Sequence, residues 1–371
     1  MLNLVCLNTF QGHSASVWKI KWSLHGELLI SSGADGLILV WGSFFYRNNY
    51  NANLKSVINL SYFFKWKLLC KFNLISVYKS YKDINWSPNT SEFCVVNFSG
   101  IFHTCQIIFF NKKKSISFKK KTSCFNSPFE IKNCKYSPNG VLISVVTRNK
   151  RLYVWKKNDK DITDCIFIDK NCKSDIKHLT WHFKHKYLIT AEYGGAINFF
   201  IKSKYTLFFK NTITFSSFYT ILKINFSKNG KNFHTSTGQG NVLIFSKKNS
   251  SNNNIVFFFC TTTNFFCTTV SEFNSSFFYT AKENGNITFK HKFLIKNRYP
   301  ICLYTGSFFF FKFKVVVTLK KSHLENTNHL TWHPLDDNIV SSCSDDTLIF
   351  IWYCSFSNLI NYRENFIETS K

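Results

Sequence analysis

The stretch from residue 129 to 200 contains two copies of one pattern placed end to end, and this repeat constrains the fold more than any other feature. In each copy an alternating apolar segment ends in a large aromatic residue, Tyr136 or Trp181, and is followed by a polar turn. A second apolar segment leads into a tight turn 13 residues beyond that aromatic residue, and a third apolar segment follows. Three short strands repeated at a step of 45 residues are typical of the blades of a β-propeller.

The same spacing can be followed along the whole chain, so we expect one all-β domain that is a seven-bladed WD40 β-propeller. The predicted blades cover residues 11–72, 73–120, 121–168, 169–210, 211–260, 261–317 and 318–354, and residues 355–371 form a tail. An inserted loop at 43–64 and a long excursion at 290–322, whose apolar run forms a strand, explain the two longest steps. The lone strand at 2–10 is expected to complete the last blade, which leaves no free sheet edge.

The first blade shows why the pattern resembles the WD40 repeat. A Gly-His pair opens it, Asp35 occupies its tight turn, and Trp41 ends its third strand six residues later. His13 can donate to Asp35, while the hydroxyl of Ser31 or Ser32 bridges His13 to the Trp41 indole. A histidine beside an aspartate can serve in acid–base catalysis, but we interpret this set as a structural network that fixes strand register. The last blade repeats the set as His323, Asp346 and Trp352.

The chain is strongly basic, with 47 lysines and arginines against 20 acidic residues and a formal net charge of +27. Nucleic acid is one partner that such a charge could serve. Codon bias is the other explanation, because Lys, Asn, Phe, Ile and Tyr are abundant together while Arg, the better reader of phosphates and bases, is rare. We favour codon bias. The lysine run at 111–121 is interpreted in the same way, as an outer strand or a solvated hairpin.

Thirteen cysteines form no C-x-x-C pair, and no secretory leader or apolar run of transmembrane length is visible. We therefore expect a soluble intracellular protein that binds no metal and no cofactor. The sequence also lacks the phosphate-binding loop, the nucleophile elbow and the H-E-x-x-H motif, so no enzyme is expected. Two histidine pairs follow the propeller pattern and are predicted to be surface turn residues rather than zinc ligands: His182 with His185, and His329 with His333.

Three blades resemble the WD40 subunit of the cytosolic iron–sulfur assembly (CIA) targeting complex. That family carries a S-R-D-K-S-x-W-x-W turn followed by a H-S-Q-D-V-K-H-x-x-W-H-P run. The corresponding residues here are T-R-N-K-R-L-Y-V-W at 147–155 and C-K-S-D-I-K-H-L-T-W-H-F at 172–183. The last blade reads H-L-E-N-T-N-H-L-T-W-H-P at 323–334 and S-C-S-D-D-T at 342–347.

The resemblance implies a non-enzymatic scaffold that helps to transfer iron–sulfur clusters to cytosolic and nuclear apoproteins. It implies a HEAT-repeat platform, a small adaptor and a hydrogenase-like carrier as partners, and a cytoplasmic location with the nucleus as a second compartment. Arg148 matches an exposed arginine that the family requires, it has no acidic partner in its own turn, and Lys150 extends the basic surface. The alternative is a basic WD40 scaffold in RNA processing, ribosome assembly or chromatin, which would use the net charge directly.

The chain also departs from the WD40 pattern in the two blades that resemble the family most. The usual turn aspartates are replaced by Asn149 and Gly194, and the opening histidine of the fourth blade is replaced by Cys172. Each lost hydrogen bond should cost about 1 kcal/mol. The ring is therefore predicted to be less stable than those of its relatives.

Overall fold

The computed structural model describes most of the predicted repeats and leaves the 43–64 insertion and the tail after residue 355 outside the described residues. The described residues are 3–42, 66–73, 80–89, 91–110, 115–157, 162–170, 172–183, 187–203, 206–214, 220–226, 230, 232–239, 241–249, 255–264, 269–270, 277–281, 287–295, 310–319, 322–336 and 338–355. Every regular element among them is a β-strand. A helix with the length and apolar character needed to cross a bilayer does not occur in this part of the chain.

The strands form seven antiparallel four-stranded sheets, one for each predicted repeat. Four sheets come from the first part of the chain: β2 (Val17–Trp22), β3 (Leu28–Gly33), β4 (Ile38–Gly42), β5 (Lys67–Phe72); β6 (Tyr81–Trp86), β7 (Glu92–Asn97), β8 (Ile101–Phe110), β9 (Ser115–Asn126); β10 (Ile131–Tyr136), β11 (Leu142–Thr147), β12 (Leu152–Lys157), β13 (Ile162–Asp169); and β14 (Ile176–Trp181), β15 (Tyr187–Glu192), β16 (Ala196–Ser203), β17 (Thr206–Thr214).

The remaining sheets come from the second part of the chain and include the N-terminal strand. They are β18 (Ile221–Phe226), β19 (Asn232–Thr237), β20 (Asn241–Asn249), β21 (Ile255–Asn264); β22 (Thr269–Val270), β23 (Phe277–Ala281), β24 (Ile287–Ile295), β25 (Phe310–Leu319); and β26 (Thr327–Trp332), β27 (Ile339–Ser344), β28 (Ile349–Ser355) with β1 (Asn3–Phe10). Strand β25 belongs to the apolar run of the predicted excursion, as expected. Residues 115–121 of the lysine run lie in the outer strand β9, and residues 111–114 lie outside the described residues.

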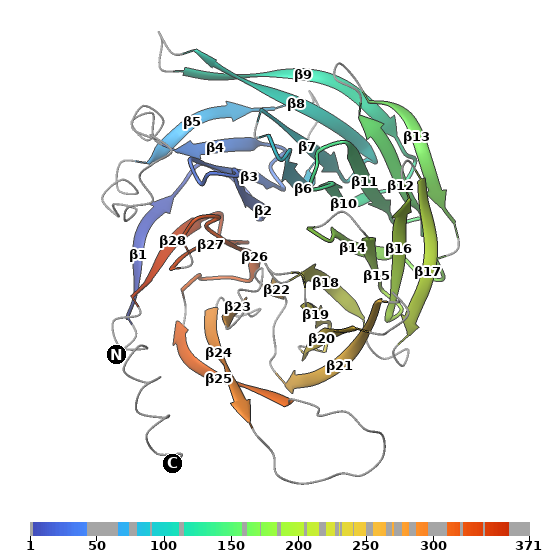
Figure 1. Ribbon diagram of the computed structural model, residues 1–371. Helices are drawn as coiled ribbons and strands as arrows, with labels where there is room; N and C mark the ends of the chain where they lie inside the picture. The colour runs from blue at the N-terminus through green and yellow to red at the C-terminus, as the bar shows by residue number, and fades with distance from the viewer. Residues whose placement is uncertain are drawn as a thin grey trace, which may run out of the picture.

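The sheets are arranged around a common centre, with the first strand of each sheet innermost (Figure 1). Each innermost strand contacts the innermost strand of the next sheet, and β26 contacts β2, so the ring is closed. This arrangement confirms the all-β propeller. In such a ring the unpaired edge of each innermost strand is short and faces the other innermost strands, so it is protected from pairing with another chain.

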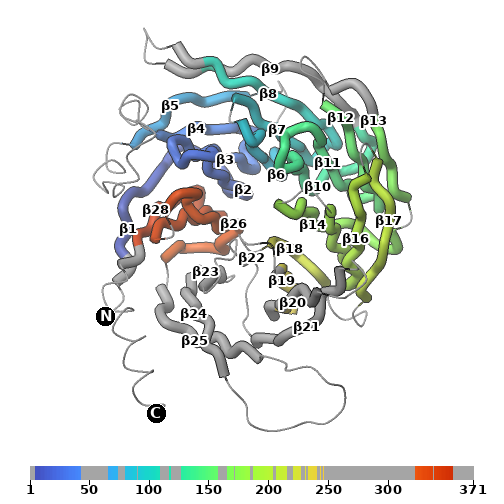
Figure 2. The backbone as a smooth tube through the Cα atoms, viewed as in Figure 1, coloured from blue at the N-terminus to red at the C-terminus, as the bar shows by residue number. Residues whose placement is uncertain are grey.

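Strand β1 closes the ring, which confirms the prediction for the N-terminal strand. It pairs antiparallel with β28, placing Cys6 opposite Trp352 and Phe10 opposite Ile349. Figure 2 shows the blue N-terminal strand β1 beside the red β28. The Phe10 ring also stacks on Trp41 of the first blade at 4.9 Å between centroids, so one strand links the last sheet to the first.

The hydrophobic core lies between consecutive sheets rather than at the centre of the ring. The second strand of a sheet, such as β3, β11 or β15, is buried along its whole length because both of its faces pack against neighbouring sheets. This burial explains why each of these strands carries consecutive apolar residues, as a strand covered on both faces should, with polar residues such as Ser31 and Glu192 held in hydrogen bonds. The turns at the ends of the strands are therefore the surfaces left for polar function.

Candidate functional site

The histidine, aspartate and tryptophan of the first blade lie in one hydrogen-bonded chain. His13 Nδ1 lies 2.9 Å from Asp35 Oδ2, and His13 Nε2 lies 2.8 Å from Ser31 Oγ. The Trp41 indole N–H donates to the same Ser31 Oγ at 2.9 Å. Ser31 is therefore the bridging hydroxyl, and Ser32 is not. The last blade contains the same four-residue network, in which Ser342 takes the bridging role between His323, Asp346 and Trp352.

The two aspartates carry shifted pKa values. Burial acts to raise the pKa of Asp35 and of Asp346, but the hydrogen bond and charge of the paired histidine, with backbone N–H donors, outweigh burial. The pKa of each aspartate is therefore lowered in the folded protein. Such a carboxylate stabilises the folded protein at a pH above its unfolded pKa of about 3.9. That stabilisation is lost as the pH falls through the lower pKa of the folded state.

Acid should therefore destabilise the ring partly through these two residues. Between about pH 5 and pH 2 we expect the melting temperature of the Asp35→Asn/Asp346→Asn variant to fall less steeply than that of the wild type, because the variant has lost two of the groups that must be protonated. Thermal unfolding followed at stepped pH measures the two slopes. Parallel slopes would show that other carboxylates carry the whole acid sensitivity.

The fourth blade replaces the lost histidine and aspartate with a different polar network. Glu192, buried at the end of β15, accepts hydrogen bonds from Ser174 N at 2.9 Å and from Asn198 Nδ2 at 2.6 Å. Ser174 Oγ in turn accepts a bond from Gly194 N at 2.7 Å. The histidine–aspartate bond of the first blade is therefore absent here, as the sequence predicts, and Glu192, two residues before Gly194, supplies other hydrogen bonds around the same turn.

The histidines that follow the anchor tryptophans are buried, so the prediction of surface histidines is wrong for both. His182 Nε2 lies 3.1 Å from the carbonyl oxygen of Gly230 in the next sheet, and His333 Nε2 lies 3.3 Å from that of Gly26. Each imidazole thus links one blade to a turn of the following blade. His329 lies within β26 and is also buried, whereas His185 lies outside the described residues. Among the described residues no group of three or more His, Cys, Asp or Glu side chains could hold a metal ion.

Arg148 occupies the turn between β11 and β12, and its side chain is 61% exposed. Its Nη1 lies 3.9 Å from Glu130 Oε2, and its Nε lies 3.9 Å from Asp175 Oδ2. The expectation concerned the turn itself, and both of these acidic partners come from outside the turn, where the sequence did not point to them. Glu130 and Asp175 come from the approaches to β10 and β14, so the guanidinium lies across two blades with one side open to solvent.

Lysines continue this set of charges on the same rim. Lys132 Nζ lies 3.3 Å from Asp175 Oδ2, and Lys82 Nζ lies 3.7 Å from Glu130 Oε1. We call Lys82, Glu130, Lys132, Arg148 and Asp175 the rim network. Four of its members, all except Arg148, were not predicted from the sequence. Lys82 and Lys132 both stand second in an innermost strand, and that shared position is a signal that the sequence offered.

Aromatic rings surround the rim network. Lys82 Nζ lies 3.9 Å from the centroid of the Trp18 ring, and Lys177 Nζ lies 4.7 Å from that of Tyr193. Burial lowers the pKa of Lys177, with the charge of Lys132 adding to the effect. Exposed aromatic side chains in this region are Phe98, Phe129 and Tyr193. Arginine together with exposed aromatic rings is the composition that protein interfaces favour.

Lys150 is exposed in the same turn as Arg148 and has a φ of 64°. The equivalent turn position holds a glycine with positive φ in other blades, at Gly36, Gly100 and Gly195. A side chain in this left-handed region costs about 1–2 kcal/mol. Thr347 accepts the same conformation in the last blade, so Lys150 is one of two residues that bear this cost in the described turns.

Comparison with known proteins identifies the repeats. The profile of the WD domain, G-beta repeat, matches residues 4–42 and 313–353, the two segments that contain the four-residue networks. Over 40 residues the chain is 42% identical to the probable cytosolic iron-sulfur protein assembly protein CIAO1 homolog of Nematostella vectensis, a match that covers 11% of this chain and 12% of that protein. The chain therefore carries WD40 repeats, which generally build scaffolds for protein contacts rather than enzymes.

Proposed function

We propose that this WD40-repeat protein is a non-enzymatic scaffold of cytosolic iron–sulfur protein assembly, acting in the cytoplasm and supplying clusters to cytosolic and nuclear apoproteins. The observation that carries the proposal is the position of Arg148, exposed on the rim at the residue where the resembling family has its required arginine. The short match to a protein named for cytosolic iron–sulfur assembly supports the same assignment. The HEAT-repeat platform, the small adaptor, the hydrogenase-like carrier and the client apoproteins are the proposed partners.

The rim network supplies a physical reason for a contact at this place. Glu130 and Asp175 hold the guanidinium from one side at 3.9 Å, which limits its rotamers before a partner arrives. A preordered arginine loses less side-chain entropy on binding than a free one. Its open side can still donate to a carboxylate or a carbonyl group of the partner. Lys150, two residues further along the turn, adds a second donor to the proposed contact.

Replacing Arg148 tests the proposal. The Arg148→Glu variant should lose the partner subunits in a pull-down, with affinity reduced about 30-fold or more, as expected for an interface residue of central importance. The new carboxylate would also be repelled by Glu130 and Asp175. The charge reversal therefore removes a hydrogen-bond donor and weakens the ion pairs of the rim network. Arg151→Glu is the matched control, since Arg151 is exposed in the same turn and its Nη1 lies 3.5 Å from the Tyr153 hydroxyl rather than beside a carboxylate of the rim network. Equal recovery of the subunits with both variants would sink the proposal.

The net charge of +27 favours one other candidate, a basic scaffold that binds RNA or chromatin. The rim network argues against RNA at this place, because Glu130 and Asp175 stand among the bases and would repel phosphates. An RNA affinity that falls steeply with salt, together with recovery of none of the proposed subunits, would favour this second function.

A further inference from the structure

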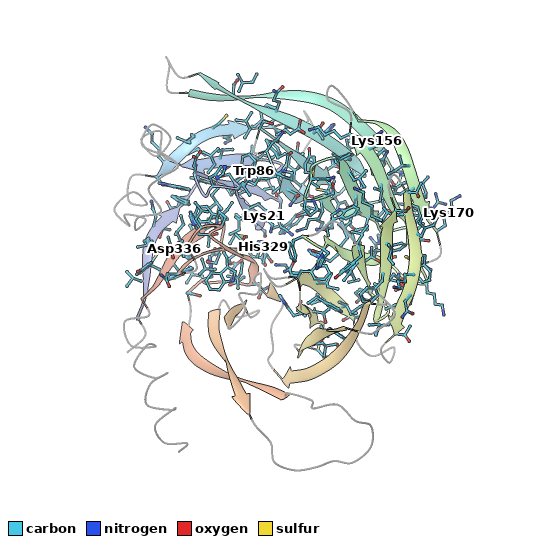
Figure 3. The ribbon with its side chains drawn as sticks, viewed as in Figure 1. Lys21, Trp86, Lys156, Lys170, His329 and Asp336 are labelled. Atoms are coloured by element: carbon cyan, nitrogen blue, oxygen red, sulfur yellow. The ribbon has the colours of Figure 1, made fainter. Side chains whose placement is uncertain are left out.

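Polar side chains gather where the innermost strands face one another. The third residue of β2, β6, β10, β14, β18 and β26 is polar in each case, and each is at most 9% exposed. These residues are Lys19, Asp83, Asn133, His178, Lys223 and His329. In Figure 3, Lys21 and His329 lie near the centre of the ring, far from the outer strands. So many buried polar groups at one place require partners, since an unpaired one costs about 1–3 kcal/mol.

Part of this set satisfies itself from strand to strand. Lys19 Nζ lies 2.9 Å from Asp83 Oδ1, and Asn133 donates to the other oxygen of Asp83. Asn133 Oδ1 then accepts a backbone N–H of β14 at 3.2 Å, and His178 Nδ1 accepts a backbone N–H of β18 at 3.4 Å. These bonds account for one side of the ring centre.

Three ring nitrogens of the two histidines remain without such a bond. Neither ring nitrogen of His329 has a hydrogen-bond partner among the described residues, and neither does Nε2 of His178. Both rings are buried, and a neutral imidazole has one N–H donor to offer. Buried polar atoms without a protein partner are the exception in folded proteins and point to a missing group.

The surrounding charge indicates the sign of that group. Burial lowers the pKa of both His178 and His329 well below the usual value, and the charges of Lys19, Lys21, Lys135 and Lys223 lower it further. All four lysines stand at the third or fifth position of an innermost strand, and these positions share the strand face on which both histidines lie. At the third and fifth positions of β2, β6, β10, β14, β18 and β26 there are four lysines and one carboxylate, Asp83, so positive charge is in excess on this face. We call these four lysines and two histidines the central basic cluster.

We propose that the central basic cluster binds a small phosphate-bearing anion. A tetrahedral phosphate presents several acceptor oxygens, which suits ammonium groups and an imidazole N–H converging from different strands. Its charge would offset the cost of burying Lys19 and Lys223. A small anion fits better than an acidic polypeptide, because the third-position side chains are at least nine-tenths buried and leave little surface for a chain to cover. This binding is separate from the rim contact proposed above.

Calorimetric titration of the intact protein with pyrophosphate tests the site. Wild-type protein should bind pyrophosphate, and Lys21→Met should weaken binding about tenfold, the usual effect of losing one charge-assisted hydrogen bond. Lys21 is only half-buried, so its loss should leave the fold intact. Lys170→Met is the matched control, because Lys170 is exposed at the outer edge of the ring in Figure 3 and should bind as the wild type does. His329→Asn should weaken binding as well, which tests the imidazole separately from the lysine.

A second titration with phenyl phosphate shows whether the site accepts phosphate esters or only free inorganic anions. Binding of pyrophosphate alone would assign the site to a free inorganic anion, and binding of both would assign it to phosphate esters as well. No heat of binding with wild-type protein at low salt would overturn the proposal. Equal affinities for wild type, Lys21→Met and Lys170→Met would also overturn it, since binding would then come from general surface charge.

Discussion

Ser31→Ala is expected to lower the free energy of unfolding by about 2–4 kcal/mol, whereas Ser32→Ala should change it by less than about 0.5 kcal/mol. Both serines lie in β3 and both side chains are fully buried, so the two variants remove the same hydroxyl group from equally buried positions. Ser31 Oγ bonds to both His13 and Trp41, and its removal leaves two buried nitrogens without that partner. Ser32 Oγ has no hydrogen-bond partner among the described residues, and burying it already carries a cost.

Chemical denaturation of the two variants and the wild type measures the difference, with circular dichroism used to verify that each variant folds. The pair is closely matched, since the same atom is removed from neighbouring positions of one strand. A loss for Ser32→Ala as large as that for Ser31→Ala would show that the network contributes no more than ordinary packing. Ser342→Ala repeats the experiment in the last blade, where Ser342 has the same two partners.

This pair also shows how far the sequence can predict the network. The spacing from Asp35 to Trp41 and from Asp346 to Trp352 predicts the members that the structure brings together. The choice between Ser31 and Ser32 depends on register, which the sequence does not specify. In the sheet Leu29 lies opposite Trp41. Because side chains alternate along a strand, Ser31 shares the face of Leu29 and Trp41, while Ser32 points to the other face.

Contacts between residues far apart in the sequence, within one blade or between blades, were the features that the sequence did not predict. Glu130 and Asp175 lie 18 and 27 residues from Arg148, so no local pattern reveals that they hold its guanidinium. His182 was predicted to be exposed because it follows a strand in a polar turn. Its burial comes from the next blade, whose Gly230 is 48 residues away. Whether a turn of one blade is buried depends on which residues of the adjacent blade pack against it. The spacing of residues within one repeat does not predict that contact.

The contact of His333 with Gly26 makes the second large prediction possible. Gly26 and Gly140 occupy equivalent turns of the first and third blades, with φ values of +71° and +73°. A Cβ atom at Gly26 would lie 2.8 Å or less from three atoms of the His333 ring, whereas at Gly140 it would meet only Pro88 and Ser87 at 3.5 Å or more. Gly140→Ala should therefore cost about 1 kcal/mol from the left-handed backbone alone. Gly26→Ala should cost about 3 kcal/mol, because the imidazole must also leave the Gly26 carbonyl.

A double-mutant cycle separates the two contributions to the cost at Gly26. In a His333→Ala background the clash is absent, so Gly26→Ala should cost only about as much as Gly140→Ala, and the coupling free energy should be about 2 kcal/mol. The free energy of unfolding of the four proteins of the cycle, measured by chemical denaturation, gives this coupling directly. Additive losses would mean that the imidazole does not press on this turn, and that the junction between the last and first blades is held by the apolar side chains and by strand β1 instead.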